Sequence, residues 1–143
     1  MSVYADTSFL VSLYTRDAHS VVAAGAMSKA DLPLFLSPFS ELELTNAVQL
    51  RFFRKELTRS QISQAFTLIH HDIASGVYFL KPLPATAFGR ALQLSRKRTP
   101  RLGTRTLDIL HVASALEFRA KTFYTFDRRQ GALAKACGLT VHP

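Results

Sequence analysis

Three aspartates stand where a predicted strand meets a predicted helix. Asp6 follows the apolar run Ser2–Ala5, and Asp127 follows the aromatic and β-branched run Thr122–Phe126. Asp108 lies where a helical pattern begins. The carboxyl ends of strands in a parallel α/β sheet line one crevice, so we expect these three side chains at the same edge. Carboxylates that converge in this way raise each other's pKa unless a cation lies between them.

The chemistry that this arrangement favours is that of a hard divalent metal. Carboxylate oxygens without a Cys or His cluster are typical ligands of Mg²⁺ or Mn²⁺ rather than of zinc. Such a metal accepts phosphate oxygens, activates water and stabilises charge developing on a phosphodiester. The structural alternative is that Asp6 and Asp108 cap helices and that Asp127 is a turn residue. Their coincidence at one predicted edge favours the metal site.

Two glutamates compete for a fourth position in this site. Ser40 is predicted to cap a helix over Glu41–Arg54, with Glu43 completing a capping box. Glu41 and Glu43 are two residues apart on that helix, so they point to nearly opposite sides and only one can face the crevice. The structural alternative is that the glutamate has no function in a site and is simply an acid in the first helical turn, where the helix dipole stabilises its negative charge.

The elements that must position these acids follow from hydrophobic periodicity and capping residues. Five strands separated by helices predict an α/β fold, a three-layer α/β/α sandwich with a central, mainly parallel five-stranded sheet. The predicted strands are Ser2–Ala5, Pro33–Ser37, Val77–Leu80, Thr122–Phe126 and Leu139–His142. The predicted helices are Phe9–Tyr14, Asp17–Ala30, Glu41–Arg54, one capped by Thr58 and Gln61 and ended by Gly76, Ala85–Arg98, one beginning near Asp108, and Arg129–Ala136.

Length and composition indicate one domain, residues 1–143, with 48% hydrophobic residues to form its core. The net charge of +8 and the pI near 10.2 favour a polyanionic partner, either nucleic acid or an acidic protein. The single cysteine, Cys137, excludes an intrachain disulfide and a cysteine-cluster metal site. Without a stretch that resembles a transmembrane helix or a signal peptide, the chain is expected to be cytoplasmic, with no membrane partner.

The densest group of cations, Arg96–Arg105, leads directly into Asp108. Its second part, Lys97–Arg105, is predicted to be a loop because it contains Pro100 and Gly103. One interpretation is a solvated loop beside a helix C-terminus, and the other is a phosphate-binding rim beside the metal site. His111, one helical turn after Asp108, is interpreted as a partly buried helix residue without a catalytic role. The candidate phosphate-binding residues are Arg98, Arg101 and Arg105.

Three stretches of the chain resemble PIN-domain ribonucleases, and specifically the VapC toxins of bacterial type II toxin–antitoxin systems. They are YADTSFLVSLY, LSPFSELELTNAV and RTLDILHVASALEFRAKTFYTFDRRQGALAKACGLTV, which together span nearly the whole chain. The last stretch is the most specific of the three. In the family pattern an acid follows the terminal Ser of the second strand by six positions, and from Ser37 this implies Glu43 rather than Glu41.

The resemblance implies a metal-dependent endoribonuclease toxin that cleaves RNA and is inhibited by a small VapB-like antitoxin. It also implies a homodimer. Thr7 or Ser8 is expected to hydrogen-bond a ligand carboxylate or a water, with satisfaction of backbone amides as the structural alternative, and Thr7 is the candidate substrate-binding residue. One alternative is a phosphatase of the haloacid-dehalogenase type, which needs a second Asp where this chain has Ser8. The other is a non-catalytic RNA-binding module on the same fold. The residues implied to be catalytic and to hold Mg²⁺ or Mn²⁺ are Asp6, Glu43, Asp108 and Asp127.

Overall fold

Five short strands form one sheet in the computed structural model, which describes residues 2–143. Their order across the sheet is β3-β2-β1-β4-β5, and every neighbouring pair runs parallel. The predicted α/β fold is therefore confirmed, and the sheet is wholly rather than mainly parallel. The strands are β1 (Val3–Ala5), β2 (Leu34–Leu36), β3 (Tyr78–Leu80), β4 (Thr122–Tyr124) and β5 (Thr140–His142).

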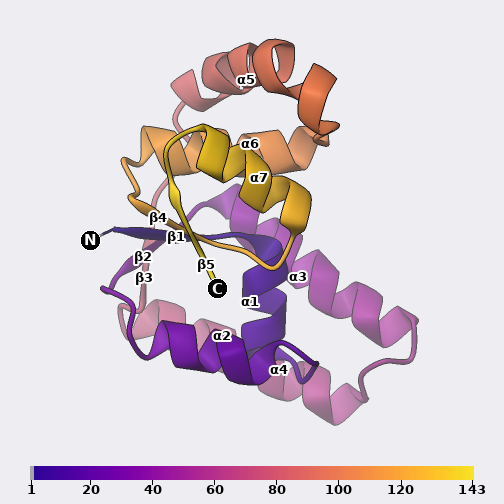
Figure 1. Cartoon of the computed structure of the whole chain (residues 1–143). Helices are drawn as coiled ribbons and strands as arrows, with labels where there is room; N and C mark the ends of the chain where they lie inside the picture. The colour runs from indigo at the N-terminus through magenta and orange to yellow at the C-terminus, as the bar shows by residue number, and fades with distance from the viewer. Residues whose placement is uncertain (1) are drawn as a thin grey trace.

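The helices form a layer on each side of this sheet (Figure 1). The first four helices pack against one another on one side, and the last three pack together on the other side. This arrangement is the expected three-layer sandwich. The helices are α1 (Thr7–Tyr14), α2 (Ser20–Met27), α3 (Pro38–Phe53), α4 (Arg59–Ala74), α5 (Thr86–Leu102), α6 (Thr106–Glu117) and α7 (Arg128–Ala136).

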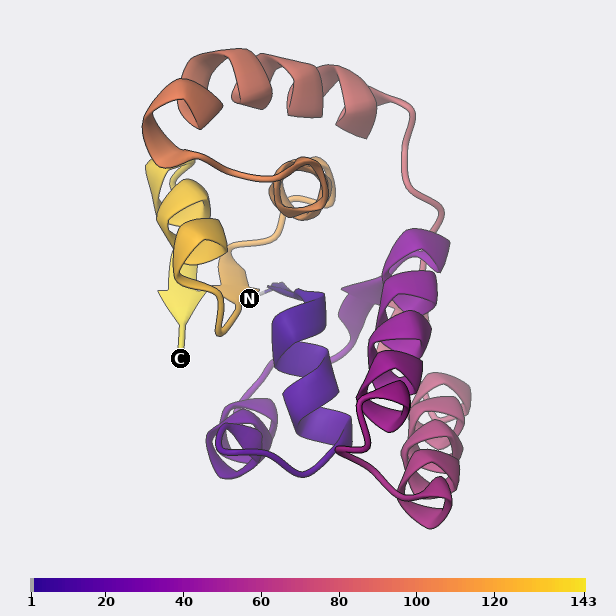
Figure 2. The same ribbon diagram turned by 90° about the vertical axis from the view of Figure 1, so that its right-hand side faces the viewer.

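The strand order contains a switch point between β1 and β4. After β1 the chain builds outward through β2 and β3, and it then returns to the other side of β1 with β4 and β5. In open parallel sheets the binding crevice lies at the carboxyl ends of the strands beside such a reversal. Figure 2 looks onto this edge, where α1, α3, α6 and α7 surround its centre.

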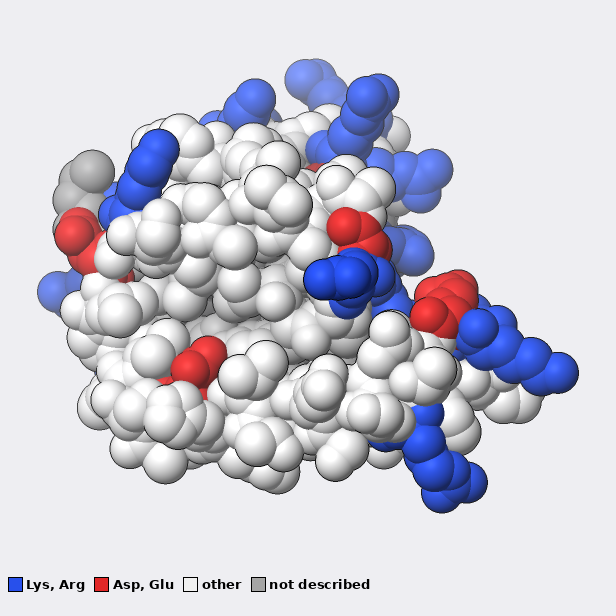
Figure 3. Space-filling model, turned by 90° about the horizontal axis from the view of Figure 1, so that it is seen from below, with Lys and Arg blue, Asp and Glu red and all other residues white. Residues whose placement is uncertain are grey.

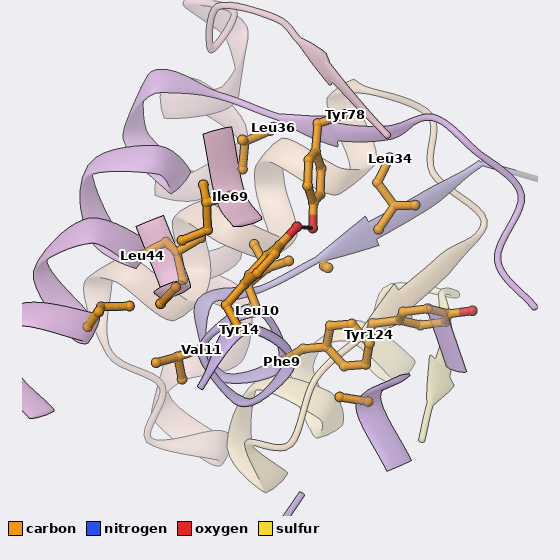
Figure 4. Close-up of a cluster of buried hydrophobic side chains, with 14 of the residues drawn as sticks. Phe9, Leu10, Val11, Tyr14, Leu34, Leu36, Leu44, Ile69, Tyr78 and Tyr124 are labelled. Atoms are coloured by element: carbon orange, nitrogen blue, oxygen red, sulfur yellow. Dashed lines mark hydrogen bonds between the residues drawn. The ribbon is translucent and has the colours of Figure 1, made fainter. Parts of the chain in front are cut away.

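Alternation along β1 divides its side chains between two cores. Val3 and Ala5 belong to the core beneath the first four helices, whereas Tyr4 packs into the core beneath the last three. The first core is shown in Figure 4, where the hydroxyls of Tyr14 and Tyr78 meet at 2.7 Å. Tyr4 thus points from the central strand toward α6, which carries Asp108.

The start of α3 differs from the prediction. The N-cap is Ser37 rather than Ser40, because Pro38 occupies the first helical turn, where its missing N–H removes no hydrogen bond. The Ser37 hydroxyl accepts a hydrogen bond from the Ser40 amide at 3.1 Å. Glu43 therefore lies in the second turn of α3 rather than in a capping box.

The predicted loop Lys97–Arg105 is wrong for most of its length, because α5 continues to Leu102. Pro100 removes one backbone hydrogen bond but does not end the helix. The helix ends where Gly103 adopts a left-handed conformation with φ of 63°, and the Gly103 amide donates to the Thr99 carbonyl at 2.8 Å.

The helix α2 is shorter than the predicted Asp17–Ala30, whereas both ends of α4 agree with the expected signals. Thr58 and Gln61 form the predicted capping box, and Gly76 takes the left-handed conformation just after α4. Within residues 2–143, no helix combines the length and the apolar character needed to cross a membrane.

Candidate active site

Asp6 ends the central strand and begins α1. One of its carboxylate oxygens accepts hydrogen bonds from the Phe9 amide at 2.9 Å and from the Ser8 hydroxyl at 2.7 Å, so Asp6 caps α1. The other oxygen accepts a short hydrogen bond from Thr125, which follows β4. The side chain is 0% exposed, and this burial raises the pKa of Asp6. The two strands at the switch point are therefore joined through this carboxylate.

Asp108 and Asp127 share one cation of the chain itself. Arg105 Nε lies 3.2 Å from Asp108 Oδ2, and Arg105 Nη2 lies 3.4 Å from Asp127 Oδ2. Asp127 also caps α7, because its other oxygen accepts from the Gln130 amide at 3.0 Å. The hydrogen bond to Asp108 and the charges of the two carboxylates raise the pKa of Arg105. Arg105 thus holds two of the predicted metal ligands together.

Glu43 reaches the same region from α3. Its carboxylate accepts a short hydrogen bond from the Thr7 hydroxyl and lies 2.5 Å from His111 Nε2. Partial burial would raise the pKa of Glu43, but hydrogen bonds from His111 and Thr7 outweigh it and hold that pKa below its ordinary value. Glu43 lines a hollow of about 420 Å³ together with Arg105 and Asp108.

The four predicted acids thus come from four elements that meet at one edge, but their side chains are not gathered around an empty centre. Across residues 2–143, no three His, Cys, Asp or Glu side chains are grouped closely enough to hold a metal ion. Each acid is engaged by residues of its own chain: Asp6 by hydroxyls, Glu43 by His111, and the other two by Arg105. The donor set of carboxylate oxygens still fits a hard divalent cation.

The candidate phosphate-binding residues have different surroundings. Arg98 is half-buried, and its guanidinium donates to the Ala136 carbonyl at 3.1 Å, at the C-terminus of α7. Arg101 is exposed in the last turn of α5, and the Arg105 side chain is 69% exposed. The hydroxyl of Thr7 donates to Glu43. Arg101 and Arg105 both present cations to solvent, and of the two Arg105 contacts the acids.

Sequence reasoning expected Thr7 or Ser8 to hydrogen-bond a ligand carboxylate, and both hydroxyls donate to a candidate acid, but it missed His111 and Thr125. His111 contacts Glu43 directly, although the sequence suggested only a partly buried helix residue. Thr125 and Ser8 both donate to Asp6, and Thr125 also accepts from the Asp127 amide at 2.9 Å. A signal was present in the hydroxyl residues, since Ser8 stands two residues after Asp6 and Thr125 two residues before Asp127.

The charge distribution agrees with a polyanionic partner at this edge. In Figure 3 many Lys and Arg side chains gather along the right-hand margin, the side on which the strands end in Figure 1. The middle of the same face is almost free of charged atoms. The net charge of +8 favours association with a polyanion such as nucleic acid.

Comparisons with known proteins agree with this geometry. The family model described as the PIN domain matches residues 3–136. The sequence matches none of the curated proteins.

Three solved structures have a similar fold. VapC20 of Mycobacterium tuberculosis, described as a sarcin-ricin loop cleaving toxin, is 20% identical with a TM-score of 0.72, and the match covers 99% of this chain and 100% of that one. PAE2754 of Pyrobaculum aerophilum is 17% identical with a TM-score of 0.63, covering 99% and 89%. FitAcB of Neisseria gonorrhoeae is 17% identical with a TM-score of 0.66, covering 99% and 96%. At these identities the likeness concerns the fold.

Proposed function

Because this chain belongs to the PIN domain family, we propose that it is a metal-dependent endoribonuclease that acts as the toxin of a toxin–antitoxin pair. The observation that supports the proposal is that four acids lie on elements that meet at the carboxyl edge of the sheet beside its switch point. They come from the end of β1, from α3, from α6 and from the start of α7. These acids are Asp6, Glu43, Asp108 and Asp127.

The four acids would hold Mg²⁺ or Mn²⁺. Bound there, the ion supplies polarisation of a phosphate and activation of water for in-line attack on a phosphodiester. The chain's own residues hold the acids in place: Thr125 donates to Asp6, and His111 donates to Glu43. Arg105, which pairs with carboxylates in this structure, has an exposed guanidinium that can exchange these partners for a phosphate oxygen of RNA.

Cleavage of RNA by the purified protein tests this proposal. We expect activity with Mg²⁺ or Mn²⁺ that a chelator removes. Asp6→Asn and Asp108→Asn should each remove cleavage and relieve growth inhibition in cells, while circular dichroism shows a folded protein. Full activity in Asp6→Asn would overturn the assignment of the site.

The toxin role predicts an RNA substrate and a protein inhibitor. VapC20, to which the fold is similar, is described as a toxin that cleaves the sarcin-ricin loop, and by analogy we propose a cytoplasmic toxin with structured RNA as substrate and a small antitoxin as inhibitor. Co-expression with the product of an adjacent short gene should relieve growth inhibition. If no neighbouring product does so, the toxin role is wrong even where RNA cleavage is found.

A homodimer is also proposed, and α5 offers a surface for it. Phe88 and Leu92 on α5 are 55% and 58% exposed, and they line one hollow with Ile109 of the neighbouring helix α6. Apolar side chains exposed together commonly mark an interface between proteins. Light scattering should give a dimer for the natural chain and a monomer for Leu92→Asp, and a monomeric natural chain would exclude this interface.

A further inference from the structure

A chain of buried polar side chains runs from the central strand to Glu43. Tyr4 is fully buried in β1, and its ring stacks on Phe123 with centroids 5.5 Å apart. Its hydroxyl lies 2.7 Å from His111 Nδ1, and the other ring nitrogen of His111 lies 2.5 Å from the Glu43 carboxylate. His111 is only 2% exposed. The imidazole therefore bridges a core hydroxyl and a carboxylate of the candidate site.

The donors and acceptors in this chain can be assigned from its chemistry. An ionised carboxylate only accepts hydrogen bonds, so His111 Nε2 carries the proton that faces Glu43. In the neutral imidazole, Nδ1 is then an acceptor, and it receives the hydroxyl proton of Tyr4. Burial raises the pKa of Tyr4, so this hydroxyl keeps its proton throughout the physiological range. One tautomer of His111 satisfies both contacts.

The same hydroxyl is also linked to the start of the helix that carries Glu43. Tyr4 Oη lies 3.2 Å from Ser40 Oγ, and Ser40 Oγ lies 3.2 Å from Ser37 Oγ. Ser37 is the N-cap of α3 and accepts a hydrogen bond from the Ser40 amide. Tyr4 therefore contacts the first turn of α3 directly and the Glu43 side chain through His111.

We propose that Tyr4 and His111 are positioning residues that hold the Glu43 carboxylate toward the candidate metal site before a metal arrives. The proposal rests on the proposed function in that Glu43 is taken as a metal ligand. Glutamate has several rotatable bonds, so a partner that fixes its direction lowers the entropy lost when the metal binds. Loss of a residue that orients a metal ligand typically weakens metal binding about 10- to 100-fold. Neither Tyr4 nor His111 touches the substrate in this role.

The test compares Mn²⁺ affinity, measured by titration calorimetry, among variants of the full chain. Tyr4→Phe keeps the stacked ring and removes only the hydroxyl, and we expect at least tenfold weaker binding. His111→Leu should have the same effect, and His111→Gln should restore part of the affinity because its amide N–H can still donate to Glu43. Tyr78→Phe is the matched control, since it removes a buried hydroxyl bonded to Tyr14 rather than to the site.

Thermal unfolding without metal separates positioning from general stability. Tyr4→Phe and Tyr78→Phe should both lower the melting temperature, but only Tyr4→Phe should weaken Mn²⁺ binding. Restoration of affinity in His111→Gln would be unexpected for a purely structural histidine. Unchanged Mn²⁺ affinity in both Tyr4→Phe and His111→Leu would overturn the proposal.

A second readout requires no metal. Nuclear magnetic resonance of the metal-free protein at fixed pH reports the Glu43 carboxyl carbon and the two His111 ring nitrogens. In the natural chain Nε2 should carry the proton, and in Tyr4→Phe and His111→Leu the Glu43 resonance should shift toward that of a freely rotating glutamate. If the natural chain binds no Mn²⁺, the proposed function is wrong. If the Glu43 resonance is unshifted in both variants, only the positioning role of Tyr4 and His111 is wrong.

Discussion

Arg105 Nη2 lies 3.4 Å from Asp127 Oδ2, although the two residues are 22 positions apart in the sequence. The same guanidinium contacts Asp108 at 3.2 Å. A positive charge of the chain itself therefore lies between two carboxylates that are predicted to bind a metal. Because like charges favour an intervening cation, we expect Arg105 to compete with a metal for this place.

Replacement of Arg105 should therefore strengthen metal binding while it weakens RNA binding. The ion pairs of this exposed side chain are screened by solvent, and we expect Arg105→Gln to bind Mn²⁺ about two- to fivefold more tightly. Titration calorimetry measures this effect, and Arg101→Gln, which removes an exposed cation without a contact to the acids, should leave the affinity unchanged. Weaker binding in Arg105→Gln would mean that Arg105 orients the acids rather than competing with a metal.

Removal of the buried charge of Asp6 should change stability in a pH-dependent way. Burial raises the pKa of Asp6 above its unfolded value, so its contribution to stability is complete below the unfolded pKa and is lost as pH rises through the folded pKa. The melting temperature of Asp6→Asn minus that of the natural chain should therefore be larger at pH 7 than at about pH 3.5. Melts with a chelator present measure the difference, and added Mn²⁺ should stabilise only the natural chain.

Asp17 provides a control of opposite sign for that experiment. Burial would raise the pKa of Asp17, but hydrogen bonds from Ser12, the His19 amide and Arg51 outweigh it and lower this pKa. Its contribution is present above the unfolded pKa and is lost as pH falls through the folded pKa. Asp17→Asn should therefore lose the most stability, relative to the natural chain, near neutral pH, and less at acidic pH. The same trend in both variants would contradict the assignment for Asp6.

The choice between the two glutamates of α3 gives a third prediction. Glu43 lines the hollow with Asp108, so Glu43→Gln should reduce RNA cleavage and Mn²⁺ affinity by more than about tenfold. Glu41→Gln is the matched control on the same helix and should retain most of both. Cleavage rates measured side by side decide the matter, and the reverse order would place the site on the other side of α3.

The structure separates two arginines that the sequence grouped together. Arg101 is exposed, so Arg101→Gln should lower the slope of log affinity against log salt for single-stranded RNA by about 0.7. Arg98 is tied to the Ala136 carbonyl, so Arg98→Gln should leave that slope unchanged and lower stability by about 1 kcal/mol. Binding is best measured in an Asp6→Asn background, where RNA stays intact. Equal slopes for Arg101→Gln and the natural chain would mean that this residue is merely solvated.

Local patterns were enough to predict the order of strands and helices and the parallel sheet. Capping residues such as Thr58 and a left-handed glycine such as Gly76 act within one helical turn, so they can be read without knowledge of the fold. The errors were also local: Pro38 moved the start of α3, and Pro100 did not end α5. Both prolines are compatible with their helices, because Pro38 lies in the first turn of α3 and Pro100 in the last turn of α5.

The sequence by itself determined that acids follow β1 and β4 and begin α6, because strand ends and helix starts are local features and parallel strands share one carboxyl edge. Only the tertiary structure decided which groups hold those acids. His111 reaches Glu43 across 68 positions, and Tyr4 reaches His111 across 107. Such contacts depend on which face of β1 packs against α6 and on the angle at which α3 crosses the edge. Those relations arise from packing of the whole core, so no spacing within the chain encodes them.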